Sequence, residues 1–475
     1  MADAGVSDAL PFDVEAAPHG DGFQISVAGG GVSRSYDVAA PTQQDFSDFF
    51  RQLAADFGTR IPHVFSGTDD PSPPDHRWRP LLTENVHRQI LCGYGDPSVL
   101  KADDGWWLVA TSNDAPDAFP ILHSADLDHW QAKGFIFPEG QTPDWAASGR
   151  GNADFWAPEM ARVGDGYWAV FTARQTNDVL AIGLARAAEP SGPWTDNGAP
   201  LITGAPISTA DLGYGVDHPQ ISCGVIEPHL FLDANGDKYL FWKDDSNGIW
   251  PRPLAMLLRQ RPRLIGEIFG DEVDRRTAAF AAAIVRWANL QRPMVRFFLM
   301  QPLIEAALAN WDRAKRALAE CGFADAILGA MTTPIRGQRI ADDGHSLLGE
   351  SSIVLANDLD WEGHLIEGPF VTRQHGRYWL FYAGNDFSTP AYGIGVAVAD
   401  HPLGPYTKQS EPLLRSTGEW LAPGHASVAP GRDGKANLFF HAFHPGPGGY
   451  NAFRALLTVG LRFTPETVEV AALPD

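Results

Sequence analysis

The sequence predicts an all-β fold, a five-bladed β-propeller that carries an inserted α-helical module and a small N-terminal α/β region. The first observation is a phrase that recurs five times, in which an apolar run, a glycine turn and an aromatic run follow one another. The second is the spacing of the five glycines, which is 61, 70, 140 and 58 residues, so one interval is twice the usual size and holds an insertion. The glycines are Gly105, Gly166, Gly236, Gly376 and Gly434.

Each phrase is expected to form a β-hairpin. In four of the five, Asp-Gly or Asn-Gly stands between runs rich in Trp, Tyr, Phe and Val, which favours a tight turn between two strands. Units of this size cannot bury their own faces alone, so five of them predict a closed ring of blades. A β-sandwich with repetitive hairpins is the alternative. The tandem Trp106–Trp107 and Tyr378–Trp379 pairs are expected between blades.

The rest of the chain divides around this repeat. Residues 1–85 match no blade, and their sequence predicts a hairpin followed by an amphipathic helix with Thr42 as its N-cap. Residues 86–250 are expected to form blades 1–3 up to the insertion, and residues 334–475 the remainder of blade 3 and blades 4–5. Residues 251–333 change to helical periodicity, as in TAAFAAAIVRWANL, and predict an inserted helical module.

Charge and composition limit the partners. The chain has 475 residues and a net charge of −22, so it repels phosphate backbones, and nucleic acid is excluded as a partner. Residues 251–340 are instead basic, with 14 Lys and Arg against 8 Asp and Glu. The apolar helix faces there form either the module's own core or a homodimer interface. We find no signal peptide and no membrane span, which favours a cytoplasmic protein.

The chemistry is expected where the five repeats meet. Nine residues before each glycine stand Asp96, Ala157, Glu227, Glu367 and His425. In a radial repeat, equivalent positions lie together at the axis, so three carboxylates and an imidazole would share one pocket. Carboxylates that repel one another acquire separate pKa values, which lets one pocket hold both an acid and a base. Hydrolysis of a glycosidic bond needs such a pair.

The ordered motifs GDPSVL, FWAPEM, IEPHLFLDANGDKYLFWKDD, IEGPF and APGHASV resemble glycoside hydrolase family 43, over residues 83–250 and 333–475. The resemblance implies a five-bladed propeller of inverting α-L-arabinofuranosidases, β-xylosidases and arabinanases. It implies that Asp96 is the general base and Glu367 the general acid. The third carboxylate, which tunes and orients the acid, is Glu227 here, where the family usually has Asp. His425 matches a family histidine near a structural calcium or sodium ion; a hydrogen-bonded axial histidine is the alternative.

Further residues are candidates for substrate binding. Phe155 and Trp156 are candidates for stacking on a sugar face, with blade packing as the alternative. Glu159 is a candidate ligand of sugar hydroxyls or a member of a buried salt bridge. Arg454 resembles a final-blade arginine that contacts the sugar, with a blade-closing ion pair as the alternative. Polar residues near the ends of second strands complete the set: Asn113, Arg174, Lys243, Asn247, Asn385 and His441.

We therefore expect an inverting, exo-acting glycosidase that removes terminal α-L-arabinofuranose or β-D-xylose from short oligosaccharides and needs no cofactor for its chemistry. Short substrates are expected because the helical module would overhang the pocket. Two other functions are open: a non-catalytic sugar-binding propeller and a glycoside phosphorylase. Turnover of aryl glycosides separates the first from an enzyme, and phosphate dependence identifies the second.

Overall fold

The chain folds into two compact units. The computed structural model describes residues 9–39, 43–62, 73–113, 115–148, 154–177, 179–204, 206–207, 221–222, 224–245, 250–291, 293–321, 325–446 and 452–473. Unit 1 consists of Met1–Asp69, Ile207–Ile221 and Ser246–Thr332, and unit 2 of Asp70–Pro206, Ser222–Asp245 and Thr333–Asp475. Thr42, Cys223 and Asn247 lie outside the described residues.

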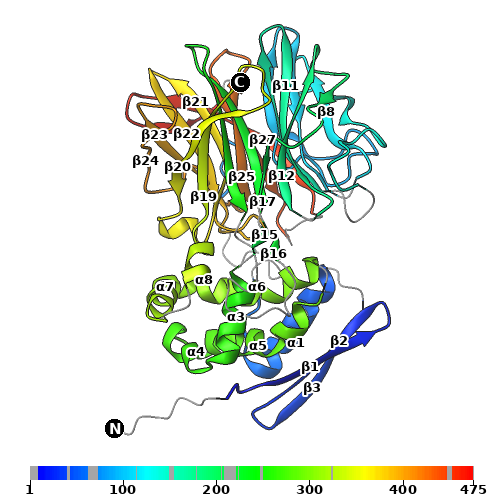
Figure 1. Cartoon of the computed structure of the whole chain (residues 1–475), viewed down its shortest axis with the longest axis vertical. Helices are drawn as coiled ribbons and strands as arrows, with labels where there is room; N and C mark the ends of the chain where they lie inside the picture. The colour runs from blue at the N-terminus through cyan, green and yellow to red at the C-terminus, as the bar shows by residue number, and fades with distance from the viewer. Residues whose placement is uncertain are drawn as a thin grey trace. The chain divides into compact units, whose positions relative to one another are not determined.

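Unit 2 is built from five antiparallel sheets that follow one another along the chain (Figure 1). Blade 1 contains β5 (Ser98–Ala102), β6 (Gly105–Val109), β8 (Ala118–Ser124) and β9 (Gln131–Phe137). Blade 2 contains β10 (Asp154–Val163), β11 (Gly166–Arg174), β12 (Leu180–Ala187) and β13 (Thr195–Asp196), with β7 (Ser112–Asn113) beside β10 and β14 (Ile202–Thr203) beside β12. A separate two-stranded sheet pairs β15 (Pro206–Ile207) with β16 (Ile221–Ser222).

The remaining three blades have the same order. Blade 3 contains β17 (Gly224–Leu232), β18 (Lys238–Asp245), β19 (Pro334–Ile340) and β20 (Leu347–Ala356). Blade 4 follows the short helix η1 (Asp360–Glu362) and contains β21 (Ile366–Gln374), β22 (Arg377–Gly384), β23 (Gly393–Ala399) and β24 (Thr407–Lys408). Blade 5 contains β25 (Leu421–Pro430), β26 (Ala436–Phe443), β27 (Arg454–Phe463) and β28 (Val468–Ala471).

The first strands of the five sheets form a closed ring. β5 contacts β10, β10 contacts β17, β17 contacts β21, β21 contacts β25, and β25 contacts β5 again. The predicted five-bladed β-propeller is therefore confirmed. The early strand β4 (Arg79–Leu82) pairs with β27 and so adds to blade 5. A ring of this kind leaves only short, protected strand edges.

Aromatic residues of the second strands fill the spaces between blades. Trp106 and Trp107 are neighbours on β6, and successive strand residues face opposite sides of a sheet. Trp107 accordingly packs among residues of blades 1 and 2, whereas Trp106 packs among residues of blades 5 and 1. Because both faces of these strands are buried, they read as continuous apolar runs in the sequence rather than as alternating ones.

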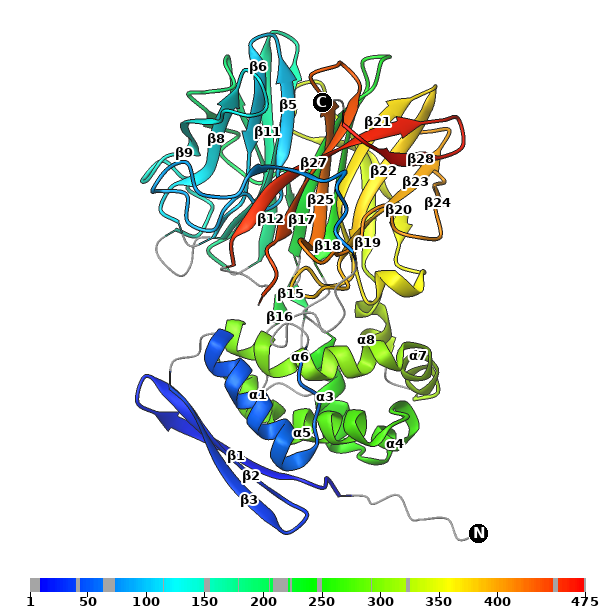
Figure 2. The same cartoon turned by 180° about the vertical axis from the view of Figure 1, so that it is seen from behind.

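Unit 1 combines a three-stranded sheet with helices (Figure 2). The sheet contains β1 (Asp13–His19), β2 (Gly22–Gly29) and β3 (Val32–Val38), and it is followed by α1 (Gln43–Phe57). The helices between β18 and β19 are α3 (Pro251–Gln260), α4 (Arg263–Ile268), α5 (Glu272–Ala288), α6 (Pro293–Ala309), α7 (Trp311–Ala319) and α8 (Asp325–Ala330). The Asp271 side chain caps α5 by accepting the backbone N–H of Asp274.

The division of the chain differs from the expected one. The N-terminal region was expected to stand apart from the inserted helices, but both belong to unit 1. The Phe49 ring of α1 lies 6.1 Å from the Phe280 ring of α5, and Arg60 forms an ion pair of 2.6 Å with buried Asp274. The apolar face of α1 thus packs against the N-terminal sheet on one side and the insertion on the other. Among the helices of the described residues, none is long and apolar enough to cross a membrane.

Candidate active site

Every first strand of the propeller carries an irregular residue at its axial end. Bulges interrupt the pairing of β10, β17, β21 and β25 with their second strands. At each of the five ends one residue has a left-handed backbone, with φ of 52° at Asp96, 46° at Ala157, 60° at Glu227, 58° at Gly368 and 50° at His425. This conformation costs a residue other than glycine about 1–2 kcal/mol, so the fold holds these positions against a local preference.

The residue after the irregular one explains how the bulge is tolerated. In four blades it is proline, namely Pro97, Pro158, Pro228 and Pro369. Proline has no N–H to donate into a strand ladder, so it is confined in sheets to edges and bulges. The fifth blade has Ala426 there.

The register of blade 4 differs from the expected one. Gly368 occupies the bulge position that Asp96, Glu227 and His425 occupy elsewhere, and Glu367 stands one residue before it. The count of nine failed because blade 4 has one residue fewer between its bulge and its turn glycine, so that Gly376 lies eight residues after Gly368. Glu367 nevertheless joins the other carboxylates, since its neighbour Gly368 donates its backbone N–H to Glu227 Oε2 at 2.6 Å.

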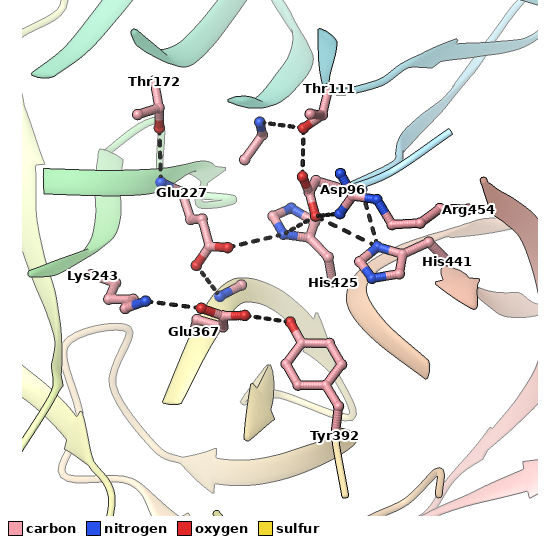
Figure 3. A network of polar contacts seen from close by, with 12 residues as sticks. Asp96, Thr111, Thr172, Glu227, Lys243, Glu367, Tyr392, His425, His441 and Arg454 are labelled. Carbon is pink, nitrogen blue, oxygen red and sulfur yellow. Dashed lines mark hydrogen bonds and ion pairs between the residues drawn. The ribbon is translucent and has the colours of Figure 1, made fainter. Parts of the chain in front are cut away.

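Asp96 lies beside Arg454, His425 and His441, where blade 5 meets blade 1 (Figure 3). Its Oδ1 lies 2.9 Å from Nη1 of Arg454, and its Oδ2 accepts a hydrogen bond of 2.5 Å from the Thr111 hydroxyl. Burial alone would raise the pKa of Asp96, but Arg454, His425 and His441 outweigh it and hold that pKa well below its usual range. The ionised form of Asp96 is therefore favoured.

Two histidines with pKa values shifted in opposite directions border the same carboxylate. The backbone N–H of Asp96 donates to Nδ1 of His441 at 3.1 Å, so this ring nitrogen carries a lone pair. Burial, together with Arg454, lowers the pKa of His441 well below its ordinary value. Nδ1 of His425 lies 3.8 Å from Glu227 Oε1 and 3.9 Å from Asp96 Oδ1. Burial opposes protonation of His425, but these two carboxylates raise its pKa above the ordinary value.

Glu367 has the opposite character to Asp96. Its Oε2 lies 2.8 Å from Nζ of Lys243, whose side chain is only 1% exposed, and its Oε1 accepts a hydrogen bond of 2.6 Å from the Tyr392 hydroxyl. Burial and the neighbouring Glu227 raise the pKa of Glu367 to about 7, although Lys243 acts in the other direction. The site thus holds one carboxylate whose pKa is held low and one whose pKa is raised to about 7.

The cation expected near His425 has a partial set of ligands. One atom each of Asp96, Glu227 and His425 lies within 4.8 Å of the others, and His425 Nδ1 is buried without a hydrogen bond. Calcium, however, takes six to eight oxygens, and Arg454 already occupies the Asp96 oxygen. The described residues therefore fit a calcium ion poorly, and a bound cation stays a prediction.

The expected wall residues lie in different surroundings. Phe155 is buried between blades 1 and 2, 5.7 Å from the Phe119 ring, so it belongs to the core and not to a sugar-stacking wall. Trp156 is half-buried at the register position of Glu367, with the Arg174 guanidinium 5.6 Å above its ring. Trp156 remains a candidate for contact with a sugar.

The other two wall candidates, Glu159 and Asn385, both form hydrogen bonds within the protein. Glu159 Oε2 lies 2.6 Å from Nδ1 of His229, and its Oε1 accepts the backbone N–H of Leu230 at 2.9 Å. Because Nε2 of His229 accepts the backbone N–H of Val371, its Nδ1 donates to Glu159 in a buried hydrogen bond between blades 2 and 3. Glu159 thus bonds to the protein at the place where a salt bridge was the alternative to sugar binding. Asn385 uses its amide locally, donating to the Trp361 carbonyl and accepting from the backbone of Asp386.

Sequence reasoning ranked some contributors too low and missed others. Lys243 and His441 were two of several polar residues at second-strand ends, and nothing in the sequence distinguished them. Thr111 and Thr172 each follow an apolar run at the end of a second strand. Their matching places in two repeats are a signal that counting back from the glycines did not use. Tyr392 lies between β22 and β23, where its contact with Glu367 depends on the path of a loop.

Comparison with known proteins places this chain in a family. The family model for glycosyl hydrolases family 43 matches residues 90–261 and 318–466, which is more than half of the chain. A probable arabinan endo-1,5-α-L-arabinosidase B of Aspergillus fumigatus is 26% identical over 41% of this chain and 46% of its own length. Xylosidase/arabinosidase 43B of Humicola insolens is 25% identical over 40% of this chain and 30% of its own length. The matches thus span less than half of these relatives.

Solved structures share the fold. A thermostable family-43 glycoside hydrolase superposes with a TM-score of 0.53 at 22% identity, over 81% of this chain and 96% of its own. An endo-1,4-β-xylanase from Bacteroides thetaiotaomicron superposes with a TM-score of 0.52 at 18% identity, over 81% of this chain and 97% of its own. From the match of its sequence, its fold and its ordered motifs, the chain belongs to glycosyl hydrolases family 43.

Proposed function

We propose that this protein hydrolyses glycosidic bonds of arabinose- or xylose-containing saccharides with inversion at the anomeric carbon. The observation that carries the proposal is the meeting of Asp96, Glu227 and Glu367 at the axial ends of three blades, in surroundings that lower the pKa of Asp96 and raise that of Glu367. In Figure 3, Glu227 and His425 lie between Asp96 and Glu367. Inversion requires a base and an acid on opposite sides of the glycosidic bond, far enough apart for a water to enter.

Asp96 is the proposed general base. Its carboxylate stays ionised beside Arg454, and Thr111 and Arg454 fix its orientation from two sides. A water held on the face of the sugar away from the leaving group would lose its proton to Asp96 as its oxygen attacks the anomeric carbon. Arg454 offsets the negative charge of Asp96 before that transfer.

Glu367 is the proposed general acid. With a pKa of about 7 it retains a proton at neutral and mildly acidic pH. That proton passes to the glycosidic oxygen as the bond to the anomeric carbon breaks. Glu227 lies beside it, holding the backbone at Gly368 and raising the pKa of Glu367 through its charge.

The stereochemical part of the proposal is tested by proton NMR of the first product. Incubation with a nitrophenyl α-L-arabinofuranoside and, separately, a nitrophenyl β-D-xyloside should release a sugar of inverted anomeric configuration before it mutarotates. A product that retains its configuration would rule out the assigned roles of water and Asp96.

The position of the cleaved bond is a separate question. We propose exo-acting removal of a terminal pentose from short oligosaccharides, whereas several relatives are named as endo-acting arabinosidases. Digestion of linear arabinan distinguishes the two. Release of monosaccharide with little loss of viscosity supports exo-action, and early release of oligosaccharides with rapid loss of viscosity supports endo-action.

A non-catalytic sugar-binding propeller is the second candidate, and one contact favours it. The Lys243 ammonium at 2.8 Å stabilises the ionised form of Glu367, which is the wrong form for an acid catalyst. A panel of nitrophenyl glycosides decides between the candidates. Binding of arabinose or xylose oligosaccharides by calorimetry, with no turnover of any aryl glycoside, would establish the binding protein.

A further inference from the structure

The junctions between neighbouring blades follow a rule. At a bulge, the backbone N–H of the left-handed residue has no partner in its own ladder and must find one elsewhere. Between blades 1 and 2, Ala157 donates its N–H to the Thr111 hydroxyl at 2.9 Å. Between blades 2 and 3, Glu227 donates its N–H to the Thr172 hydroxyl, also at 2.9 Å.

The two threonines occupy the same place in their blades. Each faces the residue that precedes the bulge: Thr172 lies on β11 and pairs with Trp156, and Thr111, which follows β6, donates its own N–H to the Gly95 carbonyl. The same position in blade 3 pairs with Ile226, and it is occupied by Lys243. Lys243 therefore stands where the repeat places a threonine.

The substitution removes an acceptor. A lysine ammonium has three N–H donors and no lone pair, so Lys243 cannot accept the N–H of Gly368 as a threonine would. Lys243 instead extends past the backbone and donates to Glu367 Oε2. The N–H of Gly368 is accepted instead by Oε2 of Glu227, on the first strand of blade 3, at 2.6 Å. Glu227 thus performs the task of the missing threonine.

The length of Glu227 matters for this contact. An aspartate at position 227 would be one carbon–carbon bond shorter, about 1.5 Å, and would leave the buried N–H of Gly368 without an acceptor unless the backbone moved. A threonine at position 243 would supply that acceptor in the geometry of Thr111 and Thr172. The glutamate at position 227 therefore supplies the acceptor that the lysine at position 243 lacks.

We propose that Lys243 and Glu227 form a coupled positioning pair for Glu367: Lys243 orients the carboxylate directly, and Glu227 fixes the adjoining backbone in place of a threonine cap. The charged and polar groups that face this pair and Glu367 come from several elements: Asp96, Tyr392, His425 and Asp245. The consequence for catalysis rests on the proposed function, whereas the coupling between residues 227 and 243 does not.

The test compares two replacements of the lysine in one background. Glu227→Asp alone should lower kcat and the midpoint of thermal unfolding, because the N–H of Gly368 loses its acceptor. Adding Lys243→Thr should restore both in part, and adding Lys243→Met, which offers no acceptor, should not. We expect kcat of the Glu227→Asp/Lys243→Thr protein to exceed that of the Glu227→Asp/Lys243→Met protein about tenfold, with KM similar in both.

Further measurements separate positioning from folding. With Glu-carboxyl ¹³C labelling, assigned by the loss of one signal in Glu367→Gln, the midpoint of the Glu367 titration should rise in both Lys243 variants, since each removes a nearby positive charge. If the two double variants unfold at the same temperature, or if Glu227→Asp unfolds like the wild type, the pair is not coupled. If no variant and no wild-type protein turns over a glycoside, the proposed function fails, and the unfolding midpoints still decide the coupling.

Discussion

The guanidinium of Arg454 lies 2.9 Å from the carboxylate of Asp96, although 358 residues separate the two along the chain. Arg454 begins β27 in the last blade, and Asp96 precedes β5 in the first. The contact therefore forms only when the propeller closes. Closure of the ring and assembly of the proposed base are one event, which makes Asp96 a probe of both stability and activity.

Asp96→Asn should lower kcat by about 10³-fold, since the amide cannot take a proton from water. It should also lower the free energy of unfolding by about 3 kcal/mol, because buried Arg454 loses its charge partner. Nitrophenyl glycoside turnover and denaturant titration measure the two effects. Near-normal kcat in a folded variant would remove Asp96 from the mechanism.

Glu367→Gln should show a dependence on the leaving group. Saccharide substrates need protonation of the departing oxygen, so their kcat should fall by about 10²–10⁴-fold. Dinitrophenyl glycosides leave without a proton and should be slowed far less. Equal losses on the two kinds of substrate would mean that Glu367 does not act as the acid.

The rate should fall on the alkaline side. A general acid acts only while protonated, so kcat/KM should be constant at mildly acidic pH and decrease above about pH 7, where Glu367 loses its proton. No matching fall is expected on the acid side down to the limit of folding, because the pKa of Asp96 is held well below its usual range. A profile of kcat/KM against pH, with stability checked at each point, measures this.

Glu159→Ala tests whether this acid holds the blades together or binds sugar. The change leaves buried His229 and the N–H of Leu230 without their acceptor, which should lower the free energy of unfolding by about 3 kcal/mol. Kinetic constants of the folded fraction should stay close to those of the wild type. A large rise in KM at unchanged stability would instead return Glu159 to the substrate pocket.

Much of the propeller could be predicted because its evidence is local and repeated. Each turn glycine and each aromatic run follows from hairpin preferences, and five copies define a ring. Asp96, Glu227 and His425 follow from the same count. Pro369 indicates the correct register of blade 4. A proline follows the left-handed residue in four blades, so Pro369 places Gly368, not Glu367, at that position.

Other features depend on contacts that no local pattern contains. The apolar face of α1 predicts a buried helix, but only the fold shows that Phe49 packs against Phe280 of the insertion. Glu159 reads equally well as a sugar ligand or an ion pair until His229 is placed beside it. Lys243 at a strand end has no distinguishing neighbour in sequence, and its partner Glu367 is 124 residues away.

The division of unit 1 has a consequence for biosynthesis. Arg60 can pair with Asp274 only after a further 214 residues have been synthesised, and Phe49 packs against the same helix, α5. A ribosome working from the N-terminus therefore exposes the apolar side of α1 while the first two and a half blades emerge, and nascent chains at that stage are candidates for chaperone binding.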